Sequence, residues 1–320
     1  MHRFMLAIFC ALFLGPLAIA NAQEWPVRPI RFVISFGPGS ASDGIARILT
    51  DDLSKQLGQP IVIIHKPGAD GAISAVEVQR SAPDGYTFLF GTNSALLVAP
   101  NLRKTPPYNV LTDFTPVGLV GLNTLFFAVH PSVPAKNMAE LVAHVRANPG
   151  KINAATGHTY GIVSTGLFAQ HNGLQIHTIP YKGEPEIIVD LLAGRVHMMV
   201  GTSTAFYAHT QAGNLRVLAA STDARNPLWP NTPTLIESGQ PPHPFAAFFA
   251  VVGPAGLSAA IAERMNREIA VALAKPEAQE RMKSQGVIAR SMTVLDFTAY
   301  LKTQNEMWKK ALADSGVEPQ

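Results

Sequence analysis

The chain has 320 residues and 47% hydrophobic residues, and its 25 basic and 22 acidic residues give a formal net charge of +3 at pH 7. The basic residues are scattered, which argues against a nucleic-acid partner or a polybasic membrane contact. The single cysteine, Cys10, lies in the N-terminal segment discussed next, so the remainder has no disulfide, no thiol catalyst and no Cys-ligated metal.

Residues 1–22 have the pattern of a cleavable secretory signal. His2 and Arg3 precede an apolar run that is too short to span a bilayer, and Ala20-Asn21-Ala22 supplies an A-x-A cleavage site. We expect cleavage after Ala22 and export to the periplasm. Cleavage removes one basic residue and no acid, which leaves a formal charge of +2 on the mature chain.

Short β-branched runs alternate with helical periodicity in the first third of the chain. Apolar residues recur every four positions from Ile45 to Leu57, which predicts a helix, and Ala72–Ser81 predicts another. The predicted strands are Ile30–Ser35, Ile61–Ile64 and Tyr86–Phe90. This spacing is typical of βαβ units and predicts a mostly parallel sheet.

The rest of the chain repeats the alternation. Asn137 and Glu140 predict a helix N-terminus, and Thr293 with Asp296 predicts another. Strands are predicted at Leu125–Val129, Ile152–Ala155, Ile176–Ile179, Val196–Val200 and Val217–Ala220, and C-terminal helices at 258–274 and 294–313. We interpret this as two α/β lobes, residues 23–123 plus 245–320 and residues 124–244, with chain crossings near Leu122–Thr124 and Pro242–Phe245.

A glycine-rich turn, Ser35–Asp43, lies between a predicted strand and a predicted helix. Backbone N–H groups at such a helix start favour an anion. The turn lacks the third glycine of a dinucleotide fingerprint and the lysine of a phosphate loop. Nucleophile-elbow and His-Glu-x-x-His motifs are absent as well, so we predict no enzyme activity, no cofactor and no metal.

Glycine- and hydroxyl-rich segments also follow several other predicted strands. They are Gly91–Ser94, Thr156–Thr159, Pro180–Gly183 and Gly201–Thr204. Taken together on two lobes, such strand-end loops suit a pocket that binds a small polar ligand.

A series of motifs in one order resembles the Bug receptors, the periplasmic component of tripartite tricarboxylate transporters. It includes Leu57-Gly58-Gln59-Pro60, Lys66-Pro67-Gly68-Ala69, Pro83-Asp84-Gly85-Tyr86-Thr87, Pro180-Tyr181-Lys182-Gly183 and Pro254-Ala255-Gly256. The resemblance implies a type II-like, two-lobed periplasmic binding protein with two mixed sheets flanked by helices and a ligand cleft between the lobes. It also implies a receptor that captures a small organic carboxylate, aliphatic or aromatic, for a membrane permease. We expect a monomer, which is the default for an exported receptor that must close freely.

Carried over by position, the resemblance implies a set of ligand-binding residues. They are Phe36, Gly37, Pro38, Gly39, Ser40, Asp43, Thr92, Asn93 and Ser94 in one lobe, and Thr156, Gly157, His158, Thr159, Tyr181, Lys182, Gly183, Thr202, Ser203 and Thr204 in the other.

Several alternatives stay open at this stage. Asp43 is either a helix cap or a ligand contact, and Lys182 either neutralises a ligand carboxylate or lies on the surface. Ser40 and His158 depart from the usual family pattern, and His158, Tyr160, Phe206 and Tyr207 suggest a pocket for an aromatic acid. A carboxylate sensor for a membrane kinase, or an exported hydrolase or isomerase, are the rival functions.

Overall fold

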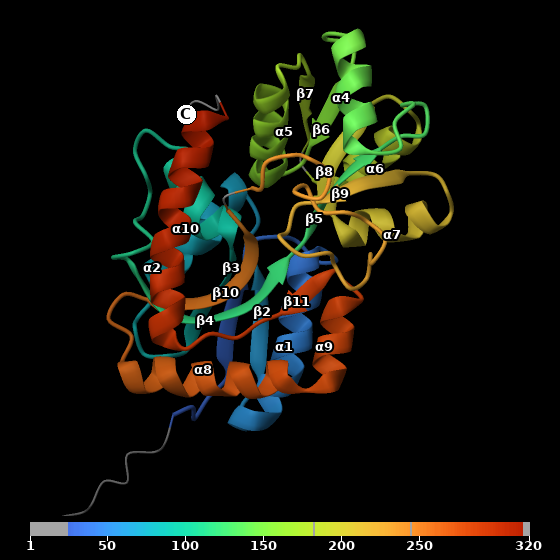
Figure 1. Ribbon diagram of the computed structural model, residues 1–320. Coiled ribbons are helices and arrows are strands. Elements are labelled where there is room, and N and C mark those ends of the chain that lie inside the picture. The colour runs from blue at the N-terminus through green and yellow to red at the C-terminus, as the bar shows by residue number, and fades with distance from the viewer. Residues whose placement is uncertain (1–24, 182, 244, 316–320) are drawn as a thin grey trace, which may run out of the picture.

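The computed structural model describes residues 25–181, 183–243 and 245–315, and it contains two β-sheets with helices on both faces (Figure 1). The proposed signal segment, residues 1–22, lies outside the described residues. The six strands of sheet A are β1 (Ile30–Ile34), β2 (Ile61–His65), β3 (Thr87–Thr92), β4 (Phe114–Asn123), β10 (Ala247–Pro254) and β11 (Val287–Ala289). The five strands of sheet B are β5 (Leu125–Val129), β6 (Asn153–Thr156), β7 (His177–Pro180), β8 (Met198–Thr202) and β9 (Arg216–Ala220).

Both sheets are mixed, as the predicted fold class states. In sheet A the order is β11-β4-β10-β3-β1-β2, and β1, β2 and β3 pair in parallel. The prediction of a mostly parallel sheet is wrong for the other half, because β10 pairs antiparallel with β3 and with β4, and β11 pairs antiparallel with β4. In sheet B, β6 is parallel to β7 and β8, whereas β5 is antiparallel to β8 and β9.

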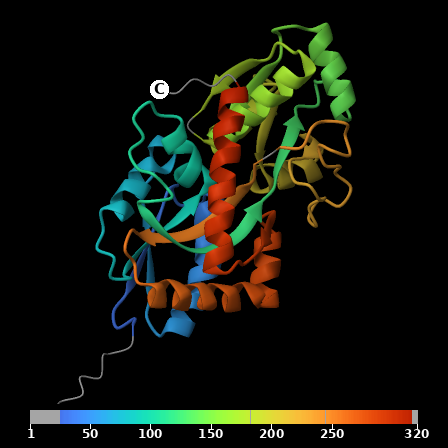
Figure 2. The same cartoon turned by 60° about the vertical axis from the view of Figure 1, so that its left-hand side comes forward.

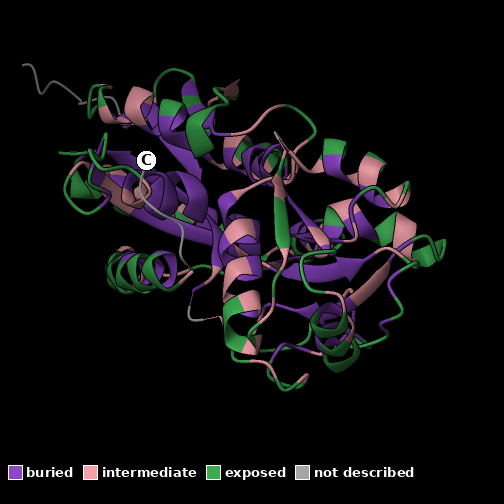
Figure 3. Ribbon diagram, turned by 90° about the horizontal axis from the view of Figure 1, so that it is seen from above, coloured by how far each residue is buried: buried purple, intermediate pink, exposed green. Residues whose placement is uncertain are grey.

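The helices cover both faces of each sheet. Those associated with sheet A are α1 (Ala41–Leu57), η1 (Ala69–Gly71), α2 (Ala72–Gln79), η2 (Ser94–Val98), α3 (Ala99–Asn101), α8 (Ala259–Ala274), α9 (Pro276–Lys283) and α10 (Val294–Asp314). Those associated with sheet B are α4 (Met138–Ala147), α5 (Thr159–Asn172), α6 (Glu184–Leu192) and α7 (Ser203–Gln211). Figure 3 shows the strands largely buried and the outer helix faces exposed.

Local sequence accounts for several helix starts. The Asn137 side chain accepts a hydrogen bond from the Glu140 N–H at the start of α4, and Thr293 accepts one from Asp296 at the start of α10. Both capping predictions are therefore confirmed. Ser40 caps α1 in the same way by accepting from the Asp43 N–H.

Helix α10 joins the two sheets, and Figure 2 shows it running past both. Near its C-terminal end Trp308 is fully buried, with ring centroids 5.6 Å from Tyr160 of α5 and 4.1 Å from Phe245. One hydrophobic core is continuous from Leu89 and Leu119 in sheet A to Phe127 and Met198 in sheet B. Burial of apolar surface thus holds the two halves of the chain together.

The chain passes between the sheets at two places. Strand β4 of sheet A ends at Asn123 and strand β5 of sheet B begins at Leu125, so the first passage is a single residue, Thr124. The return passage lies between Thr234, which bridges to Ala220, and β10. Along the described part of the chain, no helix is both long and apolar enough to cross a bilayer.

Candidate functional site

Two of the predicted loops adjoin at one edge of sheet A. Strands β1 and β3 are parallel neighbours, with Ile34 opposite Phe90, so the loops that follow them lie side by side. These sheet-A loops are Phe36–Ser40 and Thr92–Ser94. Gly39 has φ +79°, in the region that favours glycine, which lets the turn open α1 without strain.

Asp43 stabilises the first of these loops. Its carboxylate accepts a hydrogen bond from the Gly39 N–H at 3.0 Å and lies 2.9 Å from His65 Nε2 and 3.1 Å from Arg47 Nε. Burial acts to raise the pKa of Asp43, but the Gly39 hydrogen bond and the two basic side chains hold that pKa below its usual range. Ser40, and not Asp43, is the N-cap of α1, and the Asp43 carboxylate instead joins the loop to α1 and β2.

The second sheet-A loop carries an unsatisfied donor. Thr92, Asn93 and Ser94 are all buried, and Thr92 Oγ1 accepts from the Ala95 N–H. The amide nitrogen of Asn93, Nδ2, is buried and has no hydrogen-bond partner among the described residues. Buried donors are nearly always paired, so this unpaired amide is an exception that needs an explanation.

The register of β5 brings the sheet-B loops to face the sheet-A loops. The chain enters β5 directly from sheet A, and Leu125 pairs with Thr202 at the carboxyl end of β8. The carboxyl end of β6 lies beside it, because β6 and β8 are parallel. Ser203 of α7 approaches sheet A closely, since a Cβ on Gly286 would lie 2.2 Å from the Ser203 Cβ.

The predicted sheet-B loops are Thr156–Thr159, Tyr181–Gly183 and Thr202–Thr204. His158 and Thr202, from two of these loops, contact the carboxylate of Glu184, a residue absent from the predicted set. Thr202 donates its N–H to Glu184 Oε1 at 2.8 Å and its hydroxyl to Oε2 at 2.5 Å. His158 Nε2 lies 3.2 Å from Oε1. Burial acts to raise the pKa of Glu184, but His158 and Thr202 hold that pKa below its usual value.

Two glycines allow close packing around Glu184, one at its carboxylate and one at the backbone that precedes it. A Cβ on Gly201 would lie 2.8 Å from Glu184 Oε1, and a Cβ on Gly157 would lie 2.9 Å from the backbone of Gly183. Thr156, at the end of β6, is 1% exposed, and its hydroxyl oxygen has no hydrogen-bond partner in the described structure. These sheet-B strand ends therefore hold the internal carboxylate of Glu184 and the unpaired hydroxyl of Thr156.

The other predicted residues differ in their surroundings. Ser203 accepts a hydrogen bond from Trp229 Nε1 at 2.8 Å, Tyr181 donates to Asp190 at 2.8 Å, and Thr204 is exposed. Lys182 lies outside the described residues, so its two interpretations stay open.

The aromatic side chains do not form one shared surface. Tyr160 is buried against Phe245 and Trp308, Phe206 is fully buried, and Tyr207 is 39% exposed with its ring edge-on to Trp229. Packing accounts for the positions of Tyr160 and Phe206.

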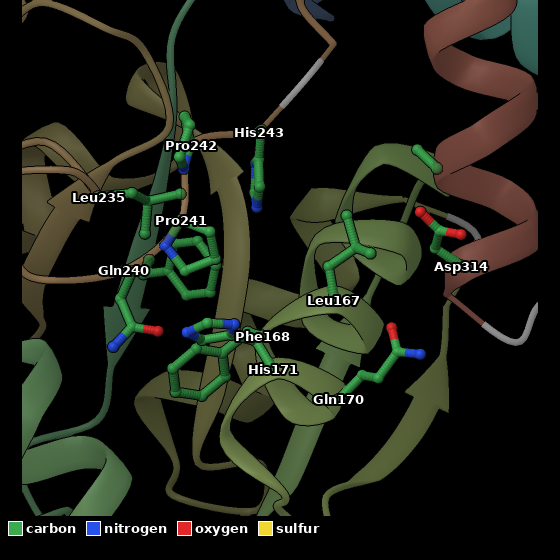
Figure 4. Close-up of a pocket in the computed structure, with 12 residues that line it drawn as sticks. Leu167, Phe168, Gln170, His171, Leu235, Gln240, Pro241, Pro242, His243 and Asp314 are labelled. Carbon is green, nitrogen blue, oxygen red and sulfur yellow. The ribbon is translucent and has the colours of Figure 1, made fainter.

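A cavity of about 440 Å³ lies away from the predicted loops, between α5, the return passage and the end of α10 (Figure 4). It is lined by Leu167, Phe168, His171, Gln240, His243 and Asp314, among others, and by none of the predicted ligand residues. His243 Nδ1 lies 3.3 Å from the Tyr160 hydroxyl and its ring stacks on Phe245, and burial lowers its pKa to about 4. In the described part of the chain no group of His, Cys, Asp and Glu forms a metal site.

Glu184, Thr165 and His243 were missed by sequence reasoning. Thr165 of α5 carries another buried hydroxyl without a partner among the described residues. Glu184 does follow Gly183 at a predicted strand end, which is a signal of its position, but nothing local indicates its partner Thr202.

Comparison with known proteins identifies the family. Residues 45–317 match the family model described as "Tripartite tricarboxylate transporter family receptor". Protein BugT of Bordetella pertussis is 33% identical over 309 residues, which cover 95% of this chain and 94% of BugT. An R. palustris protein solved with adipate has a TM-score of 0.86 and 29% identity, covering 93% of this chain and 100% of that one.

The periplasmic binding protein BugD is a further structural relative, with a TM-score of 0.83 and 29% identity over 92% of this chain and 100% of BugD. These TM-scores show that the relatives share the fold of this chain. The chain therefore belongs to the TctC family of tripartite tricarboxylate transporter receptors, whose members are solute-binding proteins and not enzymes.

Proposed function

We propose that this receptor captures a small organic carboxylate in the periplasm and delivers it to a membrane permease of the tripartite tricarboxylate type. The two lobes are residues 23–123 plus 245–320 and residues 124–244. They close about the two passages of the chain, and the ligand lies between the sheet-A loops and the sheet-B loops. The signal pattern of residues 1–22 and the periplasmic relatives support this location.

Two unpartnered buried donors carry the proposal. Asn93 Nδ2 and the Thr156 hydroxyl lie at strand ends on facing sides, and neither has a hydrogen-bond partner among the described residues. An unpaired buried polar group costs about 1–3 kcal/mol, so a bound acceptor stabilises the protein by pairing with it. A carboxylate offers only acceptors, and its charge strengthens each hydrogen bond.

The chemistry of a relative supports the same ligand class. The R. palustris relative at 29% identity was solved with adipate, a dicarboxylate. The backbone amides of Phe36–Ser40 add donors that a carboxylate can use at the start of α1.

The experiment is calorimetric titration and thermal shift of the mature chain from Gln23 against mono-, di- and tricarboxylates. A ligand at 100 times its dissociation constant adds about 2.7 kcal/mol of stability, a shift of several degrees. We expect Thr156→Val and Asn93→Leu each to weaken binding of the best ligand about tenfold or more, since each removes a charge-assisted hydrogen bond.

Thr50→Val is the matched control, because Thr50 is also buried but lies on α1 and bonds to the Arg47 carbonyl. It should leave affinity unchanged. If a folded, ligand-free sample gives no response to any carboxylate, capture of this class is refuted. Normal affinity in both variants would show that the loops are wrongly assigned.

A further inference from the structure

The sheet-B side of the proposed site already contains a negative charge of the protein's own. Glu184 is the first residue of α6, and its carboxylate accepts both the N–H and the hydroxyl of Thr202. Thr202 precedes α7 as its N-cap residue, where free N–H groups would otherwise attract an anion. Glu184 therefore takes up donors that a ligand carboxylate would need.

The hydrogen bonds around His158 define its proton position. His158 Nδ1 accepts the Gly161 N–H at 3.1 Å, so in the neutral ring the proton is on Nε2, which faces Glu184 Oε1. His158 Nε2 therefore donates to Glu184, in the same direction as the two Thr202 donors. Within the described residues, His158 is also the one basic side chain that contacts this carboxylate.

Glu184 remains accessible to a ligand. Its side chain is 18% exposed and that of His158 is 15% exposed, so neither is sealed in the core. The unpartnered hydroxyl of Thr156 belongs to the same group of loops and is a second, independent sign of a missing ligand atom.

We infer that Glu184 is a specificity-determining residue that selects carboxylates bearing an ammonium group at their far end and rejects dicarboxylates. The inference rests on the proposed function and names the ligand class of the same site. A second carboxylate placed here meets a like charge and finds the Thr202 donors occupied, whereas an ammonium gains an ion pair. The first carboxylate binds on the sheet-A side, at Asn93 and the amides of Phe36–Ser40.

The test compares probes of equal length that differ at one end. These are 6-aminohexanoate against adipate, and 4-aminobutanoate against succinate, titrated into the mature chain at pH 7 and low ionic strength. We expect the wild-type chain to bind at least one amino acid about tenfold or more tightly than its matched diacid. In Glu184→Gln this ratio should fall about tenfold, mainly because the diacid binds better.

Glu186→Gln is the matched control. It removes the same charge from the same first turn of α6, but Glu186 is exposed and forms no part of the hydrogen-bonded group. If Glu184 merely stabilised the N-terminus of α6, Glu184→Gln would change the melting temperature and leave the affinity ratio as it is in the wild type.

The outcomes separate this inference from the proposed function. The inference is overturned if the wild-type chain prefers any dicarboxylate of the wider panel, or if Glu184→Gln leaves the ratio unchanged, and carboxylate capture then still stands. Silence toward every carboxylate and amino acid overturns both. The wild-type ratio requires no variant, so a misfolded Glu184→Gln chain does not remove the test.

Discussion

Asp43 and Glu184 are two internal carboxylates at corresponding places in the two halves of the molecule, yet their charges are balanced differently. Each lies in the first turn of a helix that follows a strand-end glycine loop, and each accepts a backbone N–H. Asp43 contacts the Arg47 guanidinium as well as His65, whereas the basic side chain described in contact with Glu184 is His158 alone. Asp43 is thus paired with a guanidinium, which stays charged at any ordinary pH, whereas no guanidinium or ammonium group contacts Glu184 among the described residues.

The largest effect that we expect from removing either carboxylate is the loss of folding stability in Asp43→Ala. The variant leaves the Gly39 N–H and the His65 ring without their acceptor and removes a buried ion-pair partner of Arg47. We expect the free energy of unfolding to fall by about 3 kcal/mol, measured by urea denaturation. Asp51→Ala is the control, because the Asp51–Arg281 pair is about half exposed and should cost less than about 1 kcal/mol. Equal losses in both variants would contradict the structural role of Asp43.

His243, a partly buried base on the return passage, adds a pH effect of its own: its surroundings disfavour the charged form, whereas those of Asp43 and Glu184 favour it. His243 has a pKa of about 4 in the folded chain against an ordinary value of 6.5, because burial disfavours its charged form. The unfolded chain therefore binds a proton that the folded chain does not between these values. The His243 contribution is favourable above pH 6.5 and is lost as the pH falls toward 4, by about 2 kcal/mol.

Denaturation of the wild-type chain and of His243→Gln at pH 7 and pH 4.5 measures this effect. The variant should lose less stability on acidification than the wild-type chain. His171→Gln, at an exposed position on α5, should behave as the wild type does. A wild-type pH dependence that His243→Gln leaves unaltered would show that the ring is readily protonated in the folded state.

The predicted fold and the observed fold agree where local pattern decides and differ where long-range pairing decides. Short apolar runs between turn residues predicted the strands of sheet B and β1 to β3 to within a few residues. No strand was predicted over Phe114–Asn123, which Pro116, Gly118 and Gly121 interrupt, or over Ala247–Pro254, where a continuous apolar run has no period of two. These two strands pair antiparallel to each other, so the observed sheet is mixed where a parallel sheet was predicted.

The candidate site likewise has one part that the sequence predicted, the strand-end loops, and one part that it did not, Glu184. The rule that ligands bind at strand ends led to the loops that carry the unpartnered groups of Asn93 and Thr156. Glu184 escaped prediction because its hydrogen-bond partner Thr202 is 18 positions away and meets it only once β8 and α6 are packed. Local sequence patterns thus indicate which loops lie together at the strand ends. Tertiary packing determines which hydrogen-bond donors in those loops have no partner within the protein.

The smallest expected effect is the contribution of Glu184 to the loss of folding stability at acidic pH. The pKa of Glu184 lies below its ordinary value of 4.5 in the folded chain, so the stability it contributes is complete above that value and is lost as the pH falls below it. Because the side chain is 18% exposed, we expect a loss of only about 1 kcal/mol between pH 6 and pH 3. Comparison of Glu184→Gln with Glu186→Gln over this range isolates the contribution. If both variants flatten the curve equally, the charge of the first turn of α6, and not the contacts with Thr202 and His158, sets the pKa. The contrast between Asp43 and Glu184 would then reduce to a helix-end effect common to both.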